Sequence, residues 1–473
     1  MKKGESFVGE VIEYDFPNIG VVSVDDNGET RKVKVKNAII GQTVEATVNK
    51  KKAGLLEARL ERVVKRSDVE VESDCPHFGD CGGCLYRTFP YEAQLSIKEK
   101  QILKLIKNAI GDKAEDIDKA YEGISGSPDI EGYRNKMEFS FGDEYKDGPI
   151  ALGMHKRAST YDVVNTFDCK IVDVDFRRIL KATYDYFAAL NIPYYHKMRH
   201  DGVLRHLCVR KGKKSQEILV FLVTSSLWKE DYSEEEWKEI LDKWVEILKG
   251  IELVGTYAGI LHVNNDSFAD AVKDEGTTLL YGRDYFTEEL LGLEFKVSPF
   301  SFFQNNSRGA EILYSKVIEF LRIKEGTKPV VYDLYTGTGT IAQLISKATS
   351  KTIGVEIVEE AVEAAKESAK RNGIDNCEFI AGDVLKCLDD IDTLPDYIIL
   401  DPPRDGINPK ALAKILSYQV ERIVYVSCKP TSLARDIMSF YDQGYKVERM
   451  CMVDLFPYTY HLEVATLFVK DKN

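Results

Sequence analysis

Five apolar runs in the last third of the chain each end in an acidic residue or a thiol. Helix-like segments separate these runs, so strands and helices alternate from about residue 296 onward. Such alternation predicts a parallel sheet covered by helices, and the carboxyl ends of its strands, where ligands bind, meet at one edge. The residues at those ends are therefore candidates for one shared site: Glu356, Asp383, Asp401 and Cys428, together with the loop that follows the first run.

The first run leads into a glycine-containing loop, Asp333-Leu-Tyr-Thr-Gly-Thr-Gly-Thr340, in which Gly337 and Gly339 let the backbone approach a ligand closely. Glu356 follows 17 residues after Gly339 and is placed to accept hydrogen bonds from ribose hydroxyls, and Asp383 to hold an adenine amino group. A dinucleotide would also use the ribose acid. However, the loop lacks the third glycine of G-x-G-x-x-G, so S-adenosylmethionine fits better.

Cys428 directly follows the buried run Arg422 to Ser427 and precedes Pro430. A cysteine near a strand is usually a small core residue. The acids at the ends of the preceding runs change this interpretation and make Cys428 a candidate nucleophile. Two closing runs, Val447–Val453 and His461–Val469, supply a final hairpin and bring the expected sheet to seven strands.

The N-terminal segment, residues 1–66, consists of short alternating runs separated by turn signals. Four or five such strands predict a small closed barrel of the OB type. Lysine and arginine outnumber acidic residues eleven to three within residues 31–66, which favours a nucleic-acid platform. A protein-binding barrel is the alternative.

A cysteine cluster follows in the segment 67–90, with Cys75, Cys81 and Cys84 at C-x5-C-x2-C spacing. Cys169, far along the chain, is the best candidate for a fourth ligand. Four thiolates suit a [4Fe–4S] cluster or a structural zinc site. The asymmetric spacing is unlike the paired C-x2-C motifs of zinc ribbons and favours the iron–sulfur cluster, with zinc as the alternative.

Residues 91–295 mix strand-like and helix-like runs and predict a central α+β domain. Its clearest helices are expected at 91–111, 180–191 and 234–248. Residues 196–214 hold seven basic residues and one acidic residue. This stretch predicts either a face that contacts RNA phosphates, with Tyr194 and Tyr195 stacking on bases, or a solvated hairpin.

The 473 residues carry a net charge of −13, which argues against a general nucleic-acid coat protein. The chain begins without an apolar signal segment and has no apolar run near 18 residues in length. We therefore expect a cytoplasmic protein without membrane contact, and a monomer. In that reducing compartment the nine cysteines are expected to be core, metal-binding or catalytic thiols.

Five motifs, occurring together, resemble those of the RNA 5-methyluridine (uracil-C5) methyltransferase family. They are Phe302–Asn306, Asp333–Thr340, Asp401–Arg404, Ser427–Pro430 and Phe456–Glu463. The N-terminal barrel resembles a TRAM domain, and the cysteine cluster resembles that of the 23S ribosomal RNA branch of the family. The resemblance implies a multi-domain α/β protein whose residues 296–473 form a Rossmann-like, S-adenosylmethionine-dependent methyltransferase domain.

Uracil C5 is too weak a nucleophile to accept a methyl group directly, and thiolate attack at C6 activates it. Cys428 is the expected nucleophile, and the resemblance implies that Glu463 removes the C5 proton afterwards. Asp401 is expected to orient the base. The expected cofactor-binding residues are Gln304, Tyr335, Gly337, Gly339, Thr340, Glu356, Asp383 and Asp401. Helix or turn caps are the alternative roles for Thr340 and Asp383.

The expected activity is methylation of a specific uridine in RNA, with 23S rRNA preferred because transfer-RNA members of the family typically lack the barrel and the cluster. The alternatives are a tRNA uridine as substrate or an iron–sulfur RNA-binding protein without catalysis. A 5-methylcytosine methyltransferase is disfavoured because Asp401-Pro-Pro-Arg404 contains no second cysteine. The enzyme would extrude its target base from the surrounding RNA.

Overall fold

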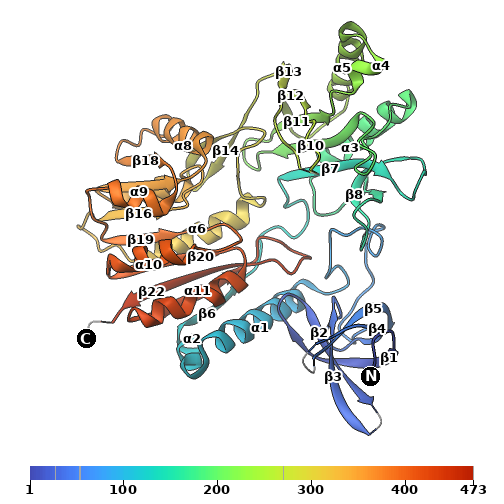
Figure 1. Ribbon diagram of the computed structural model, residues 1–473. Coiled ribbons are helices and arrows are strands. Elements are labelled where there is room, and N and C mark those ends of the chain that lie inside the picture. The colour runs from blue at the N-terminus through green and yellow to red at the C-terminus, as the bar shows by residue number, and fades with distance from the viewer. Residues whose placement is uncertain (27, 53–54, 270, 472–473) are drawn as a thin grey trace. The chain divides into compact units, whose positions relative to one another are not determined.

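The computed structural model describes residues 1–26, 28–52, 55–269 and 271–471, and its contacts divide the chain into two compact units (Figure 1). The first unit combines the two ends of the chain with a short intervening stretch: Met1–Asp74, Leu85–Gly126 and Pro402–Asn473. The second unit comprises Cys75–Cys84 and Ser127–Asp401. Residues 91–126 thus group with the barrel and the C-terminal strands, and not with the rest of the segment 91–295.

The N-terminal part of the first unit is a closed five-stranded barrel with the strand order β1-β2-β3-β5-β4. Its strands are β1 (Ser6–Asp15), β2 (Ile19–Asp26), β3 (Glu29–Lys36), β4 (Thr43–Lys52) and β5 (Leu55–Lys65). Strand β3 pairs in parallel with β5, and the other pairs are antiparallel. Alternate side chains such as Val22, Val33 and Val44 fill the interior. The expected N-terminal barrel is confirmed.

The remainder of the first unit is a set of strands covered by helices. Its elements are α1 (Tyr91–Ile110), α2 (Ala114–Ala120), β6 (Tyr121–Ser125), α10 (Pro409–Ser417), β20 (Arg422–Ser427), α11 (Pro430–Asp442), β21 (Tyr445–Val453) and β22 (Glu463–Lys470). Strand β22 is antiparallel to both β20 and β21, and β6 joins β21 in parallel. Helix α1 buries Ile97, Ile102 and Ile106, as its amphipathic pattern predicts.

The second unit contains a seven-stranded sheet with the order β13-β12-β11-β10-β7-β8-β9. Its strands and helices are β7 (Lys136–Asp143), β8 (Ile150–His155), β9 (Val163–Asn165), α3 (Val174–Leu190), β10 (Leu204–Lys211), β11 (Glu217–Thr224), α4 (Trp228–Asp231), α5 (Glu234–Lys249), β12 (Thr256–Asn264) and β13 (Thr277–Gly282). A hairpin of β14 (Phe286–Leu290) and β15 (Leu293–Val297) follows.

The same unit then alternates strands and helices over residues 307–400. These elements are α6 (Ser307–Leu321), β16 (Val330–Leu334), α7 (Thr340–Ile345), β17 (Lys351–Glu356), α8 (Glu359–Arg371), β18 (Cys377–Ala381), α9 (Val384–Asp390) and β19 (Tyr397–Leu400). The strands β18, β17, β16 and β19 are parallel neighbours in that order. The expected parallel sheet is confirmed, and the carboxyl ends of β16, β17 and β19 carry the expected acids.

The expectation of seven strands for the C-terminal sheet is wrong, because an eight-stranded sheet is formed. The additional strand is β6, Tyr-Glu-Gly-Ile-Ser, from outside the expected domain. A five-residue run with a central glycine and a charge gives little strand signal, and its pairing with β21 comes from the fold. No helix of the described residues combines the length and the apolar composition that crossing a lipid bilayer requires.

Candidate functional site

The loop between β16 and α7 turns on three left-handed positions, at every second residue. Tyr335, Gly337 and Gly339 have φ values of 65°, 57° and 71°. The backbone N–H groups of Tyr335 and Thr336 both donate to the carbonyl of Val355, at 2.9 and 3.1 Å. A Cβ on Gly339 would meet the Phe379 ring at 2.5 Å, whereas a Cβ on Gly337 would meet nothing within 4 Å. Gly339 is required by packing, and Gly337 leaves the backbone open to a ligand.

Asp333 stabilises this loop through its side chain, which bonds to Thr336 in the loop and to Ala342 of α7. Its fully buried carboxylate accepts hydrogen bonds from the Thr336 hydroxyl at 2.5 Å and the Ala342 N–H at 3.0 Å, both through Oδ2. Its Oδ1 atom is buried and has no hydrogen-bond partner among the described residues. An orphaned buried oxygen beside a glycine loop indicates a site that a polar ligand completes. Sequence reasoning treated Asp333 only as part of the motif and did not single it out as a site residue.

Glu356, at the end of β17, faces the same loop. Its Oε2 accepts the Gly337 N–H at 3.0 Å, and its Oε1 accepts the Val358 N–H at 3.0 Å. These two backbone bonds fix the carboxylate in one orientation. Because each carboxylate oxygen can accept more than one hydrogen bond, both retain capacity for a pair of ribose hydroxyls.

The other expected cofactor residues lie in the same unit. Thr340 is buried as the first residue of α7, and its hydroxyl lies 3.4 Å from that of Thr338. Asp383 is exposed at the start of α9, and its side chain makes no capping bond to that helix. Its carboxylate is therefore available for a ligand.

Gln304 comes from the loop that precedes α6, and its side chain is buried. The backbone carbonyl of Gln304 accepts a hydrogen bond from Asn135 Nδ2 at 2.9 Å. Phe302, two residues earlier, is 67% exposed. The loop thus places a buried polar side chain, Gln304, two residues from the exposed aromatic ring of Phe302.

Asp401 directly follows β19, and its backbone N–H donates to the carbonyl of Leu334 at 3.3 Å. Removal from water, with a smaller contribution from the nearby Asp333 carboxylate, raises the pKa of Asp401 to about 7. Burial likewise raises the pKa of Asp333 to about 6. Near neutral pH, Asp401 can therefore carry a proton and act as a hydrogen-bond donor as well as an acceptor.

These two carboxyls predict that the protein is less stable at alkaline pH. Their pKa values of about 7 and about 6 exceed the ordinary value of 3.8, so the folded chain binds more protons than the unfolded chain between about pH 4 and pH 7. Stability contributed by these groups therefore falls as the pH rises through that window.

We expect Asp401→Asn to raise the melting temperature at pH 8 by a few degrees and to flatten its pH dependence. Thermal unfolding from pH 5 to 8 measures this, with the exposed Asp405→Asn as control; an unchanged slope in Asp401→Asn contradicts it.

In the first unit, the register of the strands places Cys428 and Glu463 at one edge. Ser427 at the end of β20 pairs with Val464 of the antiparallel β22, and each of the two candidate residues lies one position beyond that pair. Glu463 is 2% exposed, whereas Cys428 is partly exposed. Helix α11 begins at Pro430, so the thiol lies just before a helix N-terminus, where negative charge is favoured.

The loop that leads to Glu463 is held by a buried ion pair that sequence reasoning missed. Lys98 of α1 and Asp454 are both fully buried, and Lys98 Nζ lies 2.8 Å from Asp454 Oδ1. The Tyr91 hydroxyl donates to the other carboxylate oxygen at 3.0 Å, and the Gln94 side chain accepts the Tyr458 N–H at 2.9 Å. Sequence separations of more than 350 residues left no local signal for these contacts.

The cysteine segment lies against the β8–β9 connection within the second unit. The N–H of Gly82 donates to the carbonyl of His155, and His77 Nε2 accepts the N–H of Asp168, next to Cys169. Burial raises the pKa values of Cys81 and Cys169, and neighbouring thiols of the same set raise them further. The structure therefore brings Cys169 near Cys75 and Cys81. Among the described residues, however, no group of three or more His, Cys, Asp or Glu side chains is arranged to hold a metal ion.

The basic stretch 196–214 exposes fewer cations than its composition alone indicates. Three of its cations are buried and bonded within the protein: Arg205, Arg210 and Lys211. Tyr195 is buried as well, with the guanidinium of Arg205 4.2 Å from its ring centre.

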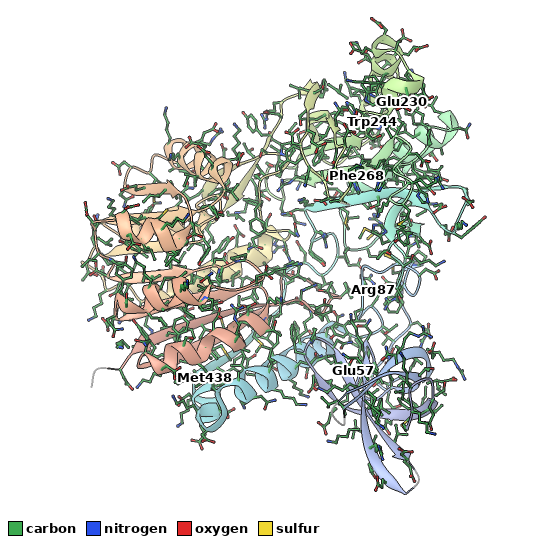
Figure 2. All side chains as sticks on the ribbon, in the orientation of Figure 1. Glu57, Arg87, Glu230, Trp244, Phe268 and Met438 are labelled. Carbon is green, nitrogen blue, oxygen red and sulfur yellow. The ribbon has the colours of Figure 1, made fainter. Side chains whose placement is uncertain are left out.

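The exposed apolar groups in this region are instead Tyr161 (53%), Met198 (66%) and Phe268 (76%), the last labelled in Figure 2. The Tyr161 hydroxyl lies 3.4 Å from the sulfur of Met198, and the His200 ring centre lies 4.7 Å from that of Phe268. We call these four residues, Tyr161, Met198, His200 and Phe268, the aromatic patch.

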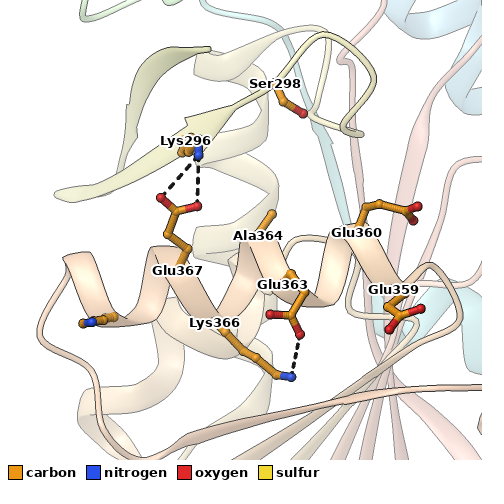
Figure 3. A pocket seen from close by; sticks show the side chains of 9 residues that line it. Lys296, Ser298, Glu359, Glu360, Glu363, Ala364, Lys366 and Glu367 are labelled. Atoms are coloured by element: carbon orange, nitrogen blue, oxygen red, sulfur yellow. Dashed lines mark hydrogen bonds and ion pairs between the residues drawn. The ribbon is translucent and has the colours of Figure 1, made fainter. Parts of the chain in front are cut away.

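A surface pocket of about 730 Å³ lies along α8 and β15. Figure 3 shows that charged side chains line it: Lys296 of β15 pairs with Glu367 of α8, and Lys366 pairs with Glu363 along α8. Ligand sites are lined mostly by hydrophobic and aromatic side chains, whereas seven of the nine residues that line this pocket are charged. We do not assign a ligand to this pocket.

Comparison with known proteins agrees with these features. A family model described as tRNA (Uracil-5-)-methyltransferase matches residues 271–471. An uncharacterized RNA methyltransferase of Caldanaerobacter subterraneus subsp. tengcongensis is 46% identical over 470 residues, covering 99% of this chain and 100% of that protein. Another, from Clostridium acetobutylicum, is 47% identical over 467 residues, covering 99% of this chain and 98% of that protein.

Among solved structures, Pyrococcus abyssi tRNA (uracil-54, C5)-methyltransferase in complex with S-adenosyl-L-homocysteine has the same fold. Its TM-score is 0.72 at 22% identity, and the match covers 98% of this chain and 100% of that chain. The parallel strands and their glycine loop define the class, an S-adenosylmethionine-dependent methyltransferase. The family model and the relatives identify the family within this class: the chain belongs to the uracil-5 RNA methyltransferase family.

Proposed function

We propose that this enzyme methylates C5 of a specific uridine in 23S rRNA through a covalent bond between Cys428 and C6 of the uracil. The observation that carries the mechanism is the strand register that puts a partly exposed thiol and a buried carboxylate at one edge, one residue beyond the pair Ser427 and Val464. A nucleophile and a base are the two groups that this chemistry requires.

The second unit is proposed to bind S-adenosylmethionine, whose sulfonium supplies the electrophilic methyl group. Glu356 would accept hydrogen bonds from the ribose hydroxyls, since both of its oxygens are already oriented by backbone N–H groups. Gly337 admits the ligand to the backbone, and the orphaned Oδ1 of Asp333 offers a buried acceptor. Further contacts are assigned to Gln304, Tyr335, Gly339, Thr340, Asp383 and Asp401.

The uracil chemistry is assigned to three side chains. Cys428 attacks C6, forming a carbon–sulfur bond and placing the electron pair on C5, which takes the methyl group. Asp401, with its pKa raised to about 7, orients the base by donating or accepting a hydrogen bond at its polar edge. Glu463 then removes the C5 proton, and the electrons of that bond expel the Cys428 thiolate.

The choice of 23S rRNA rests on the N-terminal barrel and the cysteine segment. A tRNA uridine is the second candidate, because the structure from Pyrococcus abyssi bears that name and the family model is described by it. Mass mapping of rRNA and tRNA from a deletion strain tests the choice. We expect a 5-methyluridine to disappear from 23S rRNA alone; loss from tRNA alone assigns the other substrate, and loss from neither contradicts both.

We further propose that Cys75, Cys81, Cys84 and Cys169 bind a [4Fe–4S] cluster with a structural role. Support comes from the four-thiol donor set within one unit and from the mutual influence of Cys75, Cys81 and Cys169. The cluster would tie two distant stretches of chain together. Iron and sulfide analysis of anaerobically purified protein tests this, and four iron atoms per chain are expected. One zinc and no sulfide supports the alternative metal.

The aromatic patch is proposed to stack on unpaired bases of the RNA. Phe268 and Met198 are large, strongly exposed side chains on which bases can stack. Lys197 and Arg199 flank Met198 in the same turn and add positive charge, with Arg199 paired to Asp201 at 3.0 Å. We expect Phe268→Ala combined with Met198→Ala to weaken RNA binding about 10-fold or more, since each stacked base contributes about 1–3 kcal/mol. Filter binding with a 23S rRNA fragment measures this. Replacing Leu279, which is exposed on β13, is the control, and equal binding by both variants excludes the patch.

A further inference from the structure

The loop from Ser298 to Asn306 connects β15 to α6 and carries Phe302 and Gln304. It contains no helix or strand, so its conformation depends on contacts from elsewhere. Two hydrogen bonds lie within it, both between Ser298 and Ser301: the Ser301 hydroxyl donates to the Ser298 carbonyl at 3.1 Å and accepts the Ser298 N–H at 3.0 Å. A loop of this kind positions a ligand-binding side chain only if its backbone is held.

Arg210 of β10 supplies such a contact. Its side chain is 1% exposed, and its Nη1 donates to the carbonyl oxygens of Ser298 (2.6 Å), Pro299 (2.9 Å) and Ser301 (2.9 Å). Burial lowers the pKa of Arg210 to about 10, so the group remains charged at neutral pH. A buried charge is costly unless it is well compensated, and three converging carbonyl dipoles compensate this one.

Asn135 holds the other end of the loop. Its Nδ2 donates to the Gln304 carbonyl at 2.9 Å and to the Ser307 hydroxyl at 2.8 Å, and its N–H donates to the Asn305 carbonyl at 2.9 Å. The carbonyl of Asn135 in turn accepts the N–H of Lys211, the residue after Arg210. Both anchors therefore lie at the same end of the neighbouring central strands β10 and β7, where Arg210 pairs with Lys136.

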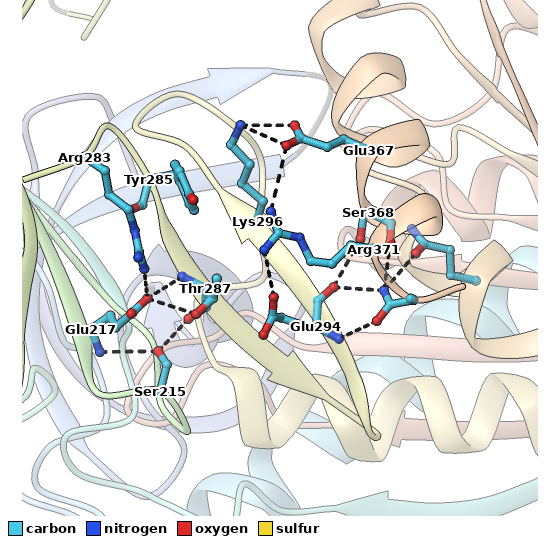
Figure 4. A network of polar contacts seen from close by, with 12 residues as sticks. Ser215, Glu217, Arg283, Tyr285, Thr287, Glu294, Lys296, Glu367, Ser368 and Arg371 are labelled. Carbon is cyan, nitrogen blue, oxygen red and sulfur yellow. Dashed lines mark hydrogen bonds and ion pairs between the residues drawn. The ribbon is translucent and has the colours of Figure 1, made fainter. Parts of the chain in front are cut away.

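The hairpin before the loop is held by a further network, part of which Figure 4 shows. Glu217 accepts from the N–H and hydroxyl of Thr287 and pairs with Arg283, while Lys296 pairs with Glu367 of α8. None of these bonds reaches residues 298–306. The hairpin also contacts the two anchors, since the Arg210 guanidinium lies 5.8 Å from the centre of the Phe286 ring and the Ser307 hydroxyl donates to Glu288. The Arg283–Glu217 pair, however, can be removed without breaking a hydrogen bond to residues 298–306.

We propose that Arg210 is a positioning residue for the cofactor, with Asn135 as its partner: together they fix the backbone of the loop so that Gln304 is pre-set for binding. This rests on the proposed role of Gln304 in the cofactor site. The seven-stranded sheet then contributes to catalysis through the shape of the cofactor site, in addition to any contact with RNA.

Calorimetric titration with S-adenosylhomocysteine tests the proposal. We expect Arg210→Met to weaken binding about 10- to 100-fold, the scale of losing a supporting contact, and Arg210→Lys to restore part of it. The KM for S-adenosylmethionine should rise more than kcat falls. Asn135→Ser, which removes the two Nδ2 bonds, should also weaken binding of S-adenosylhomocysteine. It provides the test of the positioning role if Arg210→Met does not fold.

Arg283→Met is the matched control, because it removes a partly exposed ion pair that holds the hairpin without removing a hydrogen bond to the loop. It should lower the melting temperature and leave the affinity for S-adenosylhomocysteine within about twofold of the wild type. Wild-type affinity in Arg210→Met and Asn135→Ser, or equal loss in Arg283→Met, overturns the positioning role. Failure of the wild-type protein to bind S-adenosylhomocysteine contradicts the proposed function instead.

Discussion

Cys428→Ser is expected to abolish methyl transfer, lowering the single-turnover rate by on the order of 10⁶-fold, the scale of losing an enzyme nucleophile. A serine hydroxyl is almost entirely protonated at neutral pH and attacks C6 poorly, whereas a thiol is partly ionised and strongly nucleophilic. The two side chains are nearly the same size, so the end of β20 keeps its packing. Transfer of a labelled methyl group to unmodified 23S rRNA fragment measures the rate.

Cys387→Ser provides the matched control, since Cys387 is a half-buried thiol on α9 that has no assigned role. It should retain the wild-type rate within about twofold. Binding of S-adenosylhomocysteine should be unchanged in both variants. If Cys428→Ser keeps more than a small fraction of wild-type activity, the thiol is not the nucleophile.

Glu463→Gln is expected to stop the reaction after methyl transfer and to accumulate the methylated RNA bound covalently to the protein. Glutamine matches the shape of the 2%-exposed glutamate but cannot accept the C5 proton. Turnover should fall about 10²- to 10⁴-fold, the usual contribution of a general base. A band of higher mass on denaturing gels, formed with ordinary RNA and S-adenosylmethionine, is the readout.

Glu448→Gln, on the neighbouring strand β21, is the control for this variant and should turn over normally without a trapped complex. Normal turnover by Glu463→Gln would assign the proton to another group. Loss of turnover without a trapped complex would place Glu463 before the methyl transfer, as a residue that orients the base.

The strands that carry the site were predictable from the sequence because their signals are local. The runs at Val330–Leu334 and Arg422–Ser427 are apolar, lie between polar segments, and form β16 and β20 with those bounds. The acids at the strand ends were predictable for the same reason, since topology alone brings them to one edge. The antiparallel direction of β22, on which the proximity of Glu463 to Cys428 depends, is also observed.

The supporting contacts were not predictable, because they join residues far apart in the chain. Lys98 and Asp454 are 356 residues apart, and Arg210 reaches carbonyls 88 to 91 residues away. Composition was misleading in the basic stretch for a related reason. Lys211 is buried between Asp173 and Asp175, with Nζ–carboxylate distances of 3.0 and 2.8 Å, so its charge is used inside the protein.

The most direct test of the central claim is incubation of the enzyme with S-adenosylmethionine and RNA that contains 5-fluorouridine at the target position. Fluorine at C5 cannot leave as a proton does, so a Cys428–C6 bond that forms during methyl transfer becomes permanent. The account predicts a stable complex whose mass equals protein plus methylated RNA, with the cross-link mapped to Cys428. Absence of this complex, or its formation by Cys428→Ser, contradicts the covalent mechanism.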